Sequence, residues 1–431
     1  MSGLNILIIT YDWPPRNSIA VHRPYAWAKH WSCSDCNVTV LTAEKCLYDS
    51  PLDLVLPELD GVKVVEVPYR SSFNGRKTTS TKFVRSIIID LLKKQVGFFR
   101  KVLRLSLDIR DAWAKKAEKV ALDLHEKKKF DVVVSSYGPR ACHFIGRTLK
   151  ESDSSIFWVA DYRDMWSIRH NADLQGGRKH REQRLERKTL KRADLLTTVS
   201  APLVSQLKAF LEKDVNLVFN GYDLDLSEVK GRIGLQKKAL RKNKLLKIAY
   251  TGMIYPGWQD PAPLFQAVGE LIEEGKITPS QVRIDFFGKR QPQIQAIVHH
   301  YDAGEYVKIH GHVTRETALE EQRKADLLLL MESGNEAAKG VLTGKVFEYM
   351  VSGKPILSLG SQKNSAIGQL IEETGIGIVC EQDIEKIKKC LQGLISGSEM
   401  NEFCPNFEKI KLYNRGAQSQ DFLRLIKSRI Y

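Results

Sequence analysis

The stretch LTGKVFEYMVSGKPIL, residues 342–357, decides the fold of this chain. Its spacing predicts a short helix that ends before Gly353 and is followed by an aliphatic strand. Lys345 lies in the first turn of this helix and Glu348 lies three residues later, so both side chains share one face. An ammonium group there can neutralise a phosphate, and a carboxylate can accept hydrogen bonds from ribose hydroxyls. The alternative is a surface ion pair that contributes only about 0.2–0.5 kcal/mol.

This helix and strand belong to a series, because the same alternation continues on both sides. Short aliphatic runs predict strands, and longer segments with apolar residues every three or four positions predict helices. The expected strands are residues 4–10, 38–42, 62–67, 130–136, 157–161, 195–200, 215–219, 247–251, 283–288, 307–310, 325–331, 355–359 and 377–380. The expected helices include residues 23–31, 178–192, 261–274, 315–324 and 345–351. Such βα repeats predict parallel sheets with right-handed crossovers.

The length of 431 residues exceeds one ordinary core, so more than one domain is expected. The strand and helix rhythm restarts after a linker near residues 205–225, and residues 229–244 lack strong periodicity. We therefore predict an α/β fold with a Rossmann-like first domain over residues 1–205 and a Rossmann-like second domain over residues 206–407.

The composition is typical of a globular protein, with 43% apolar and 27% charged residues. The chain has no run of about 18 apolar residues, and its first residues lack the basic start and apolar run of a secretory signal. Seven cysteines, with a lone C-x-x-C at Cys33 and Cys36, favour reduced thiols over a metal or redox site. These features predict a cytoplasmic protein.

The net charge of +15 favours a polyanionic partner: nucleic acid, an anionic membrane or a phosphorylated substrate. Part of the charge lies in an amphipathic stretch between Phe83 and Leu105, with Lys93, Lys94 and Arg100 among its basic residues. A helix of this kind can lie on a membrane surface. A helix packed on its own domain with a solvated basic face has the same pattern. Both alternatives stay open. The protein is therefore expected in the cytoplasm, with association to the cytoplasmic face of a membrane as one alternative.

The residues that follow each strand are the candidates for a site, because ligands of open α/β sheets bind at the carboxyl ends of strands. The first strand is followed by a loop with Arg16 and a helix start near Arg23, where an anion is favoured. The segment DYRDMW, residues 161–166, follows another strand, and its carboxylates and aromatic rings suit a sugar. The alternatives are an ordinary rigid turn at the first place and ion pairs between domains at the second.

Glycine follows three strands of the second half directly, at Gly252, Gly288 and Gly311. Lys289 and Arg290 come next after the second of these strands. A glycine at this point lets a ligand approach the backbone. Three such glycines in one domain indicate a ligand-binding edge.

Four parts of the chain resemble the retaining GT-B glycosyltransferases of family 4, in a branch found in bacterial surface-polysaccharide synthesis. The resemblance covers nearly the whole chain, and the last motif is the most specific. The motifs are ILIITYDWPPRNSIAVHRPYAWAKHW (6–31), FDVVVSSYGPR (130–140) with WVADYRDMW (158–166), AYTGMIYPGWQDPAPLFQAV (249–268) and TGKVFEYMVSGKPILSLG (343–360).

The resemblance implies two Rossmann-like domains that face each other across a cleft, the first holding the acceptor and the second the donor. It implies that a helix at about residues 408–429 packs back on the first domain. Glu348 would hold the ribose of a nucleotide-sugar donor, expected to be linked to uridine diphosphate (UDP), and Lys345 would lie near the diphosphate. The loop at residues 14–23 would face the donor. The implied reaction is a retaining transfer to a glycan or lipid-linked acceptor, without a metal ion or other cofactor.

The sequence departs from the family pattern at three places. The second family glutamate, eight residues before the ribose glutamate, is replaced by Gly340, and either Glu332 or Glu336 could substitute for it. Trp258 and Gln259 stand where a basic residue is usual. The glycine pair after the first strand is replaced by residues 17–18, Asn-Ser. Neutralisation of a diphosphate would then depend on Lys345, assisted by Lys289, Arg290 or Arg16.

The candidate site combines the residues after the strands with the family motifs. The expected catalytic residues are Lys345, Asp161 and Arg163; the donor-binding residues are Glu348, Gly252, Gly288, Lys289, Arg290, Gly311, Thr343 and Gly344; and the acceptor-binding residues are Arg16, Arg23, Asp164 and Trp166. The D-x-D at residues 223–225 follows Asn-Gly and is interpreted as a linker turn rather than a metal site. An inactive glycosyltransferase-like scaffold is the main alternative. A nucleic-acid-binding protein is suggested only by the charge, and no nucleic-acid module is recognisable.

Overall fold

Two parallel sheets form because the aliphatic runs are buried on both faces and pair with one another in register. The structure is a computed structural model. It describes residues 3–46, 51–68, 108, 110–168, 176–235, 245–255, 257–288, 291–397 and 403–431. The amphipathic stretch between Phe83 and Leu105 and the pair Lys289 and Arg290 lie outside the described residues. Within the described ranges, no helix has both the length and the hydrophobicity that spanning a bilayer requires.

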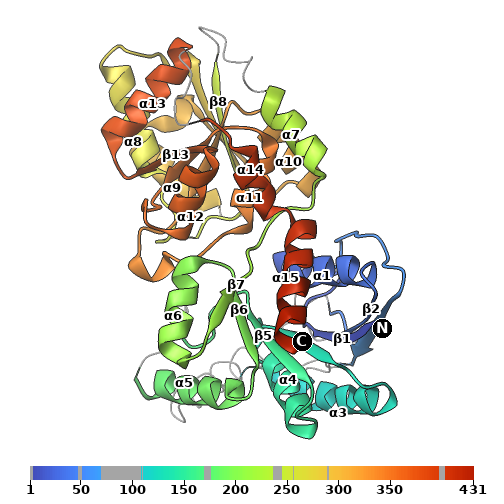
Figure 1. The fold of residues 1–431 in the computed structure, drawn as a ribbon. Helices are drawn as coiled ribbons and strands as arrows, with labels where there is room; N and C mark the ends of the chain where they lie inside the picture. The colour runs from blue at the N-terminus through green and yellow to red at the C-terminus, as the bar shows by residue number, and fades with distance from the viewer. Residues whose placement is uncertain are drawn as a thin grey trace, which may run out of the picture. The chain divides into compact units, whose positions relative to one another are not determined.

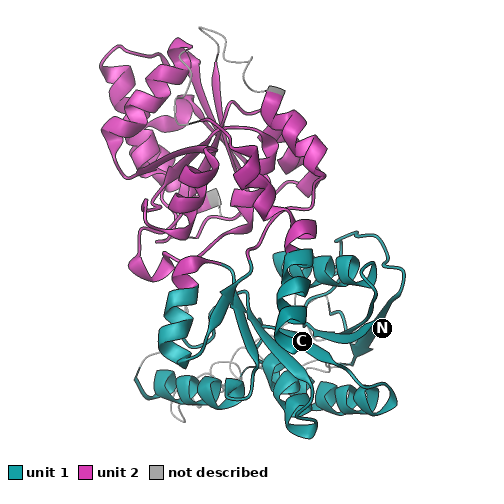
Figure 2. Cartoon of the chain, in the orientation of Figure 1, with its two compact units in different colours: residues 1–199, 204–218, 419–431 teal, residues 200–203, 219–418 magenta. Residues whose placement is uncertain are grey.

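The described residues separate into two compact units, shown in two colours in Figure 2. The first unit contains residues 1–199, 204–218 and 419–431, and the second contains residues 200–203 and 219–418. Residues 206–218, which the sequence assigned to the second domain, instead belong to the first unit. The reason is that Val215–Leu217 forms strand β7, which pairs with strand β6 (Leu195–Thr198) of the first sheet.

The sheet of the first unit has seven strands in the order β3-β2-β1-β4-β5-β6-β7, all parallel (Figure 1). The remaining strands are β1 (Leu4–Ile9), β2 (Cys36–Ala43), β3 (Val62–Val67), β4 (Val132–Ser136) and β5 (Phe157–Tyr162). Its helices are α1 (His22–Ser32), α3 (Asp111–Lys127), α4 (Ala141–Ser152), α5 (Gly176–Leu190) and most of α6 (Ala201–Leu211). The strand order reverses between β1 and β4, which makes that position the switch point of the sheet.

The sheet of the second unit has six strands in the order β10-β9-β8-β11-β12-β13, again all parallel. The strands are β8 (Leu246–Thr251), β9 (Val282–Phe287), β10 (Val307–Gly311), β11 (Leu327–Met331), β12 (Ile356–Leu359) and β13 (Gly377–Glu381). The helices are α7 (Leu226–Leu235), α8 (Ala262–Glu273), α9 (Gln291–His300), α10 (Arg315–Lys324), α11 (Gly344–Ser352), α12 (Ala366–Thr374), α13 (Ile384–Ser396) and α14 (Phe407–Ile410). The switch point of this sheet lies between β8 and β11. The predicted α/β fold with two Rossmann-like parallel sheets is thus confirmed.

Helices cover both faces of the second sheet. Helices α8, α9 and α13 contribute buried residues such as Leu264, Ile294 and Ile387 to one core cluster. Helices α7, α11 and α12 contribute Val229, Val346 and other residues to the opposite cluster. The sequence showed no strong periodicity over residues 229–244. Helix α7 nevertheless forms, because the burial of Val229 adds packing energy that compensates for a weak local helix propensity.

The expected C-terminal helix is divided into α14, a short 3-10 helix (Lys411–Tyr413) and α15, and Asn414 separates the last two. Helix α15 spans Arg415–Ile430, and Ala417 in its first turn donates its backbone N–H to the Asn414 side chain. From residue 419 onward α15 belongs to the first unit and packs on α1. Phe422 contacts the rings of Trp27 and Trp31, and the Trp31 indole donates to the Ser419 carbonyl over 2.8 Å.

Two segments of the second unit are tied together: one follows the entry of the chain into this unit at residue 219, and the other precedes its exit at residue 418. The backbone N–H of Tyr222 donates to the Tyr413 carbonyl, and the N–H of Arg415 donates to the Tyr222 carbonyl. Asp223 pairs with Arg415, and Asp225 accepts from the backbone and hydroxyl of Ser227. The D-x-D therefore forms a turn and an anchor, in agreement with its interpretation from the sequence.

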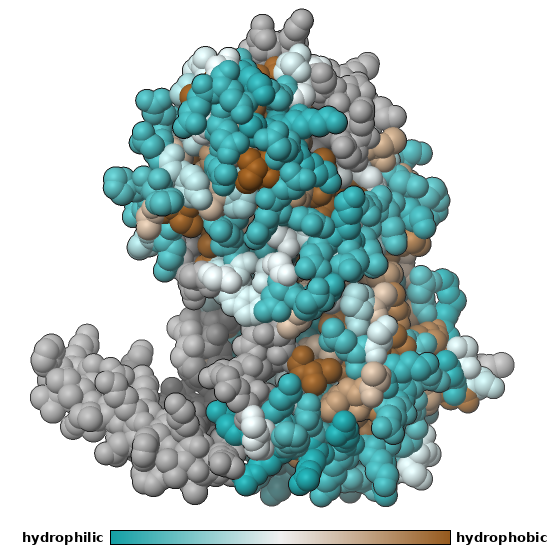
Figure 3. All heavy atoms as spheres, turned by 90° about the vertical axis from the view of Figure 1, so that its left-hand side faces the viewer, coloured by the Kyte–Doolittle hydropathy of each residue, from teal (hydrophilic) through white to brown (hydrophobic). Residues whose placement is uncertain are grey.

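The surface view in Figure 3 shows a face covered mainly by hydrophilic side chains, with hydrophobic ones scattered among them. Exposed large hydrophobic residues among the described ones include Ile19, Val55 and Leu412, which are far apart in the sequence. Scattered residues of this kind are ordinary on a protein surface.

We predict that Phe422→Ala lowers the free energy of unfolding of the first unit by about 3–5 kcal/mol, because it leaves a cavity between two tryptophan rings. Urea unfolding followed by tryptophan fluorescence measures the change. Arg424→Ala on the same helix is the control, since Arg424 is exposed and its ion pair is worth little. Equal unfolding midpoints for the two variants would contradict the packing of α15 on α1.

Candidate functional site

The switch point of the second sheet is open because β8 and β11 pair over only two positions. Ile248 and Ala249 are opposite Leu327 and Leu328, whereas β8 pairs with β9 along six residues. Beyond Ala249 the two strands no longer bond to each other, and their backbone groups need other partners. Polar side chains from the loops and from α11 therefore enter this position.

Two side chains satisfy the backbone groups that the diverging strands expose. The Tyr349 hydroxyl accepts from the Thr251 backbone N–H over 3.0 Å, and the Gln259 amide donates to the Met331 carbonyl over 3.0 Å. Gln259 also accepts from the Tyr255 backbone N–H, so it holds the loop after β8 against the end of β11. Gln259 is therefore a buried structural amide.

Three strand ends meet through glycine backbones. The N–H of Gly252 donates to the Phe287 carbonyl and the N–H of Gly288 donates to the Gly311 carbonyl, both over 2.7 Å. A Cβ at position 288 would lie 1.9 Å from the Gly252 carbonyl oxygen, so only glycine fits there. The sequence predicted that a ligand approaches these glycines; the close approach in the structure is between neighbouring strand ends, and the approach of a ligand stays a prediction.

Lys345 lies beside this edge in the first turn of α11. Its Nζ donates to the Tyr250 hydroxyl over 2.7 Å and lies 4.8 Å from the centre of the Tyr250 ring. The carbon chain of Lys345 fills the space where a Cβ of residue 252 would be. Burial lowers the pKa of Lys345, and the nearby carboxylates of Glu332 and Glu348 oppose that shift. Its hydrogen bonds go to two neutral oxygens, the Tyr250 hydroxyl and the Met253 carbonyl, so the ammonium group can still attract an anion.

Glu332 is the carboxylate whose charge acts most strongly on Lys345. It follows β11 directly and accepts a hydrogen bond from the Thr343 hydroxyl over 3.1 Å. Burial raises the pKa of Glu332 to about 7, while the charge of Lys345 acts in the opposite direction. Glu336, the other candidate from the sequence, is exposed and pairs with Lys339 over 2.6 Å. Of the two carboxylates, Glu332 is the one positioned to act with Lys345.

Gly340 is a glycine for a structural reason. A Cβ at this position would lie 2.5 Å from the Leu203 side chain, and the Gly340 carbonyl accepts from the Ser200 hydroxyl over 2.7 Å. A glutamate could enter only if residues 200–203 moved. The departure from the family pattern at residue 340 therefore accompanies a packing contact inside the second unit.

Glu348 lies at the rim, with about one third of its side chain exposed. Its Oε1 accepts from Nη2 of Arg315, the first residue of α10, over 3.1 Å. Thr343 precedes α11, and its hydroxyl donates to Glu332 rather than capping the helix. The sequence pointed to Thr343, Gly344 and Glu348, but it missed Arg315. The sequence did contain a signal for Arg315, because this residue begins a helix soon after Gly311, at the carboxyl end of a strand.

In the first unit, Asp161 and Arg23 form a buried ion pair. Arg23 donates to both oxygens of Asp161, over 3.2 and 2.7 Å, and the Asp161 side chain is fully buried. Ser136 and Thr197 donate one further hydrogen bond each to the same carboxylate. Each oxygen thus has two donors, so Asp161 in this arrangement positions Arg23 and the strand ends rather than contacting a ligand.

Trp166 is also enclosed by the first unit. Its indole donates to Glu182 over 2.8 Å, and only 2% of the residue is exposed. The Tyr137 ring stacks on the indole and, because the residue is almost fully buried, Trp166 has no exposed face for a sugar ring in this structure. The sequence indicated an aromatic residue that stacks on a sugar, whereas the structure shows a ring that supports the loop after β5.

Arg163, Asp164 and Arg16 gather with one acid that the sequence did not single out, Asp12. Arg163 donates to Asp164 over 3.1 Å, and one of its terminal nitrogens lies 3.9 Å from Asp12. Arg16 lies 3.5 Å from the other oxygen of Asp12 and is itself buried. These groups follow β1 and β5, next to the switch point of the first sheet. They form a charged edge that can bind polar groups of a substrate.

No protein-family model and no curated protein sequence matches the chain. Among solved structures, sucrose-phosphate synthase from Thermosynechococcus elongatus matches with a TM-score of 0.61 and 13% identity, over 99% of this chain and 98% of that one. The apo form of the lipopolysaccharide outer core galactosyltransferase WaaB matches with a TM-score of 0.61 and 12% identity, over 99% and 100%. The UDP-GlcNAc 2-epimerase from Methanocaldococcus jannaschii matches with a TM-score of 0.51 and 13% identity, over 99% of each chain.

These likenesses show that the chain shares the fold of glycosyltransferases, which confirms the predicted GT-B fold class. The identities are low, and the epimerase has a related fold. The reaction therefore has to be argued from the site rather than from the fold.

We predict that Glu332→Gln becomes more stable relative to the wild type as the pH rises from 5 to 8. A carboxyl whose folded pKa is raised to about 7 contributes stability that is complete below about 4.5 and lost as the pH rises through 7. The difference in unfolding free energy should change by at most about 3 kcal/mol. Urea unfolding at four pH values measures it.

The exposed Glu336→Gln variant is the control, and its stability should follow that of the wild type at every pH. If the unfolding free energies of Glu332→Gln and the wild type differ by the same amount at every pH, the pKa of Glu332 is not raised in the folded protein.

Proposed function

We propose that the protein is a glycosyltransferase that moves a sugar from a UDP-linked donor to a glycan or lipid-linked acceptor. The observation that carries the proposal is the group formed by Lys345, Glu332 and Glu348 at the switch point of the second sheet. Ligands of doubly wound sheets bind at such points. The fold that the chain shares with glycosyltransferases supports the same conclusion.

In this proposal the diphosphate of the donor lies at Lys345. Lys345 lies in the first turn of α11, so its ammonium group and the N-terminus of the helix attract an anion to the same position. The partly exposed Glu348 would accept hydrogen bonds from the ribose hydroxyls, and Arg315 holds its carboxylate in place. Donor binding would thus use the two residues whose spacing first indicated the site.

The proposed transfer breaks the bond between the anomeric carbon and the diphosphate oxygen. Negative charge grows on that oxygen as the bond breaks, and the Lys345 ammonium stabilises it. The acceptor hydroxyl forms a new bond to the same face of the anomeric carbon and gives its proton to the departing phosphate. The sugar therefore keeps its configuration, and the proposal assigns no metal ion or other cofactor to the step.

The proposed acceptor site is the charged edge of the first unit, with Arg163, Asp164 and Asp12 as its accessible polar groups. Carboxylates and guanidinium groups together can hold hydroxyl groups of a glycan. The buried pair of Asp161 and Arg23 would keep this edge in shape. Peripheral membrane contact and a cytoplasmic location remain predictions from the sequence, because the amphipathic stretch lies outside the described residues.

We expect UDP to raise the melting temperature of the protein. At about 100 times the dissociation constant, one bound ligand adds about 2.7 kcal/mol to the stability of the folded state. A thermal-shift panel of UDP, ADP and GDP, followed by UDP-sugars, measures the effect. Failure of every nucleotide diphosphate to shift the melting temperature would overturn the proposal. Binding of UDP without turnover on any UDP-sugar would favour the inactive scaffold.

Glu348→Ala should weaken UDP binding in the same assay and in calorimetry by about 1.5–3 kcal/mol, because a charged acceptor of ribose hydroxyls is lost. Glu316→Ala is the matched control, since Glu316 is an exposed acid on the neighbouring helix α10. Equal affinities of the two variants would exclude a role of Glu348 in donor binding.

Lys345→Met should lower kcat by about 100-fold or more while changing donor affinity much less, because charge on the leaving oxygen is greatest in the transition state. Turnover and the donor Kd are measured on the same preparation. Lys363→Met, at an exposed lysine, should behave as the wild type. A Lys345→Met variant whose Kd and kcat change by the same factor would show ground-state binding only.

A further inference from the structure

A cavity of about 730 Å³ opens in the second unit and is separate from most of the donor group. Its walls come from the loop after β8, the first turn of α8, one side of α9 and the ends of β11, β12 and β13. Its volume lies within the roughly 300–1,000 Å³ that is usual for small-molecule sites. Helix α11, which carries Lys345 and Glu348, contributes no residue to the walls. Glu332 is the residue of the Lys345 group that also lines the cavity.

The polar groups of the cavity do not suit a phosphate. Among the described residues that line it, there are two acids, three glutamines, one histidine and no lysine or arginine. The start of α8 is a poor anion site as well, because Pro261 and Pro263 lack an N–H and the Ala262 N–H already donates to Asp260 over 2.9 Å. A ligand of this cavity should therefore be uncharged or carry a positive charge.

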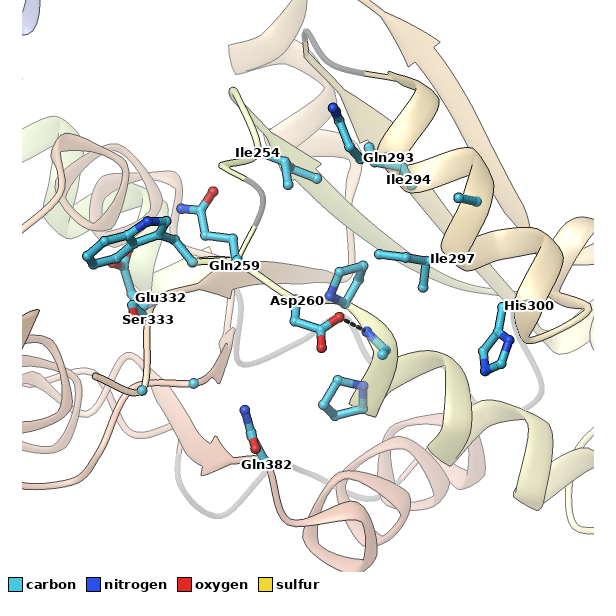
Figure 4. Close-up of a pocket in the computed structure, with 18 of the residues that line it drawn as sticks. Ile254, Gln259, Asp260, Gln293, Ile294, Ile297, His300, Glu332, Ser333 and Gln382 are labelled. Atoms are coloured by element: carbon cyan, nitrogen blue, oxygen red, sulfur yellow. Dashed lines mark hydrogen bonds between the residues drawn. The ribbon is translucent and has the colours of Figure 1, made fainter. Parts of the chain in front are cut away.

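The walls combine carboxylates and amides with apolar surfaces. In Figure 4, Glu332 and Ser333 lie at one side of the view and His300 at the other, with Asp260 between them. The isoleucines of the cavity lie across from Gln382 in the same view. Trp258 and Tyr301 add aromatic surface. A ligand that fits such walls has hydroxyl groups around its edge and apolar C–H faces, which is the chemistry of a sugar ring.

We propose that this cavity is a second carbohydrate site, which binds a neutral saccharide of one or two rings independently of the nucleotide. The acids and amides accept and donate hydrogen bonds to the hydroxyls, and the aromatic and aliphatic side chains cover the ring faces. Asp260, together with Glu332 when that carboxyl is ionised, makes the site unfavourable for a uronic acid, because like charges repel. The site gives the enzyme a way to hold part of a glycan on the unit that carries the donor group.

The test measures saccharide binding directly, by saturation-transfer NMR on the full chain. The probes are methyl α-glucoside, maltose, lactose and glucuronic acid. We expect at least one neutral probe to bind, and its signal to exceed that of glucuronic acid several-fold. Saturating UDP should leave this signal unchanged. Binding of glucuronic acid as strong as that of the neutral probes would overturn the proposed chemistry.

Two tryptophan substitutions on α9 provide the matched variants. Ala296 lines the cavity, and Ala296→Trp should fill it and reduce the saccharide signal at least fivefold. The neighbouring Gln295 is exposed and does not line the cavity, so Gln295→Trp should bind as the wild type does. Both variants should keep the wild-type melting temperature. Unchanged binding by Ala296→Trp would place the saccharide elsewhere and overturn the inference.

The outcomes separate this inference from the proposed donor site. A protein that binds UDP but no neutral probe keeps the proposed function and loses the second site. A protein that binds a neutral probe through the cavity but binds no nucleotide keeps the second site and loses the proposed function. If a UDP-hexose displaces the neutral probe while UDP does not, the cavity holds the sugar of the donor, and the claim of a separate site is wrong.

Discussion

The short pairing between β8 and β11 is the interaction on which the second unit depends. Parallel strands at a switch point send their helices to opposite faces of the sheet, so the strands separate as they approach their carboxyl ends. The separation exposes backbone groups that must be bonded. Tyr349 bonds one of them, and because it is the next residue after Glu348, this single hydrogen bond fixes the helix that carries the candidate donor residues. Gln259 bonds the other and fixes the loop that lines the cavity.

The first unit uses a buried charge for a similar purpose. Removing an ion such as Asp161 from water costs several kcal/mol, and the four hydrogen bonds to its carboxylate offset that cost. The bonds come from α1, β4 and β6, so one side chain of β5 ties together the elements around the switch point. Loss of Arg23 alone would leave the carboxylate buried without its charge partner, which is more damaging than loss of the pair.

The strands and most helices were predictable because continuous aliphatic runs and helical spacing are local properties. The spacing of Lys345 and Glu348 also showed a shared helix face. The electrostatic interaction of Lys345 with Glu332 was not predictable, since it depends on where β11 ends in space. The sequence pattern of residues 161–166 did not show which of its side chains are buried. Charged and aromatic residues after a strand have the same sequence pattern whether they meet a ligand or, as with Asp161 and Trp166, are enclosed by their own unit.

The C-terminal segment has a consequence for the order of folding during synthesis. Residues 419–431 complete the hydrophobic core around Trp27 and Trp31, yet they are made about 200 residues after the rest of the first unit. At about 5–20 residues per second, the ribosome needs at least about ten seconds to supply them. During that interval, the side chains of Trp27 and Trp31 on α1 are not covered by α15. The nascent chain therefore exposes an apolar patch before α15 is synthesised. A chaperone or another chain can bind to this patch in the meantime.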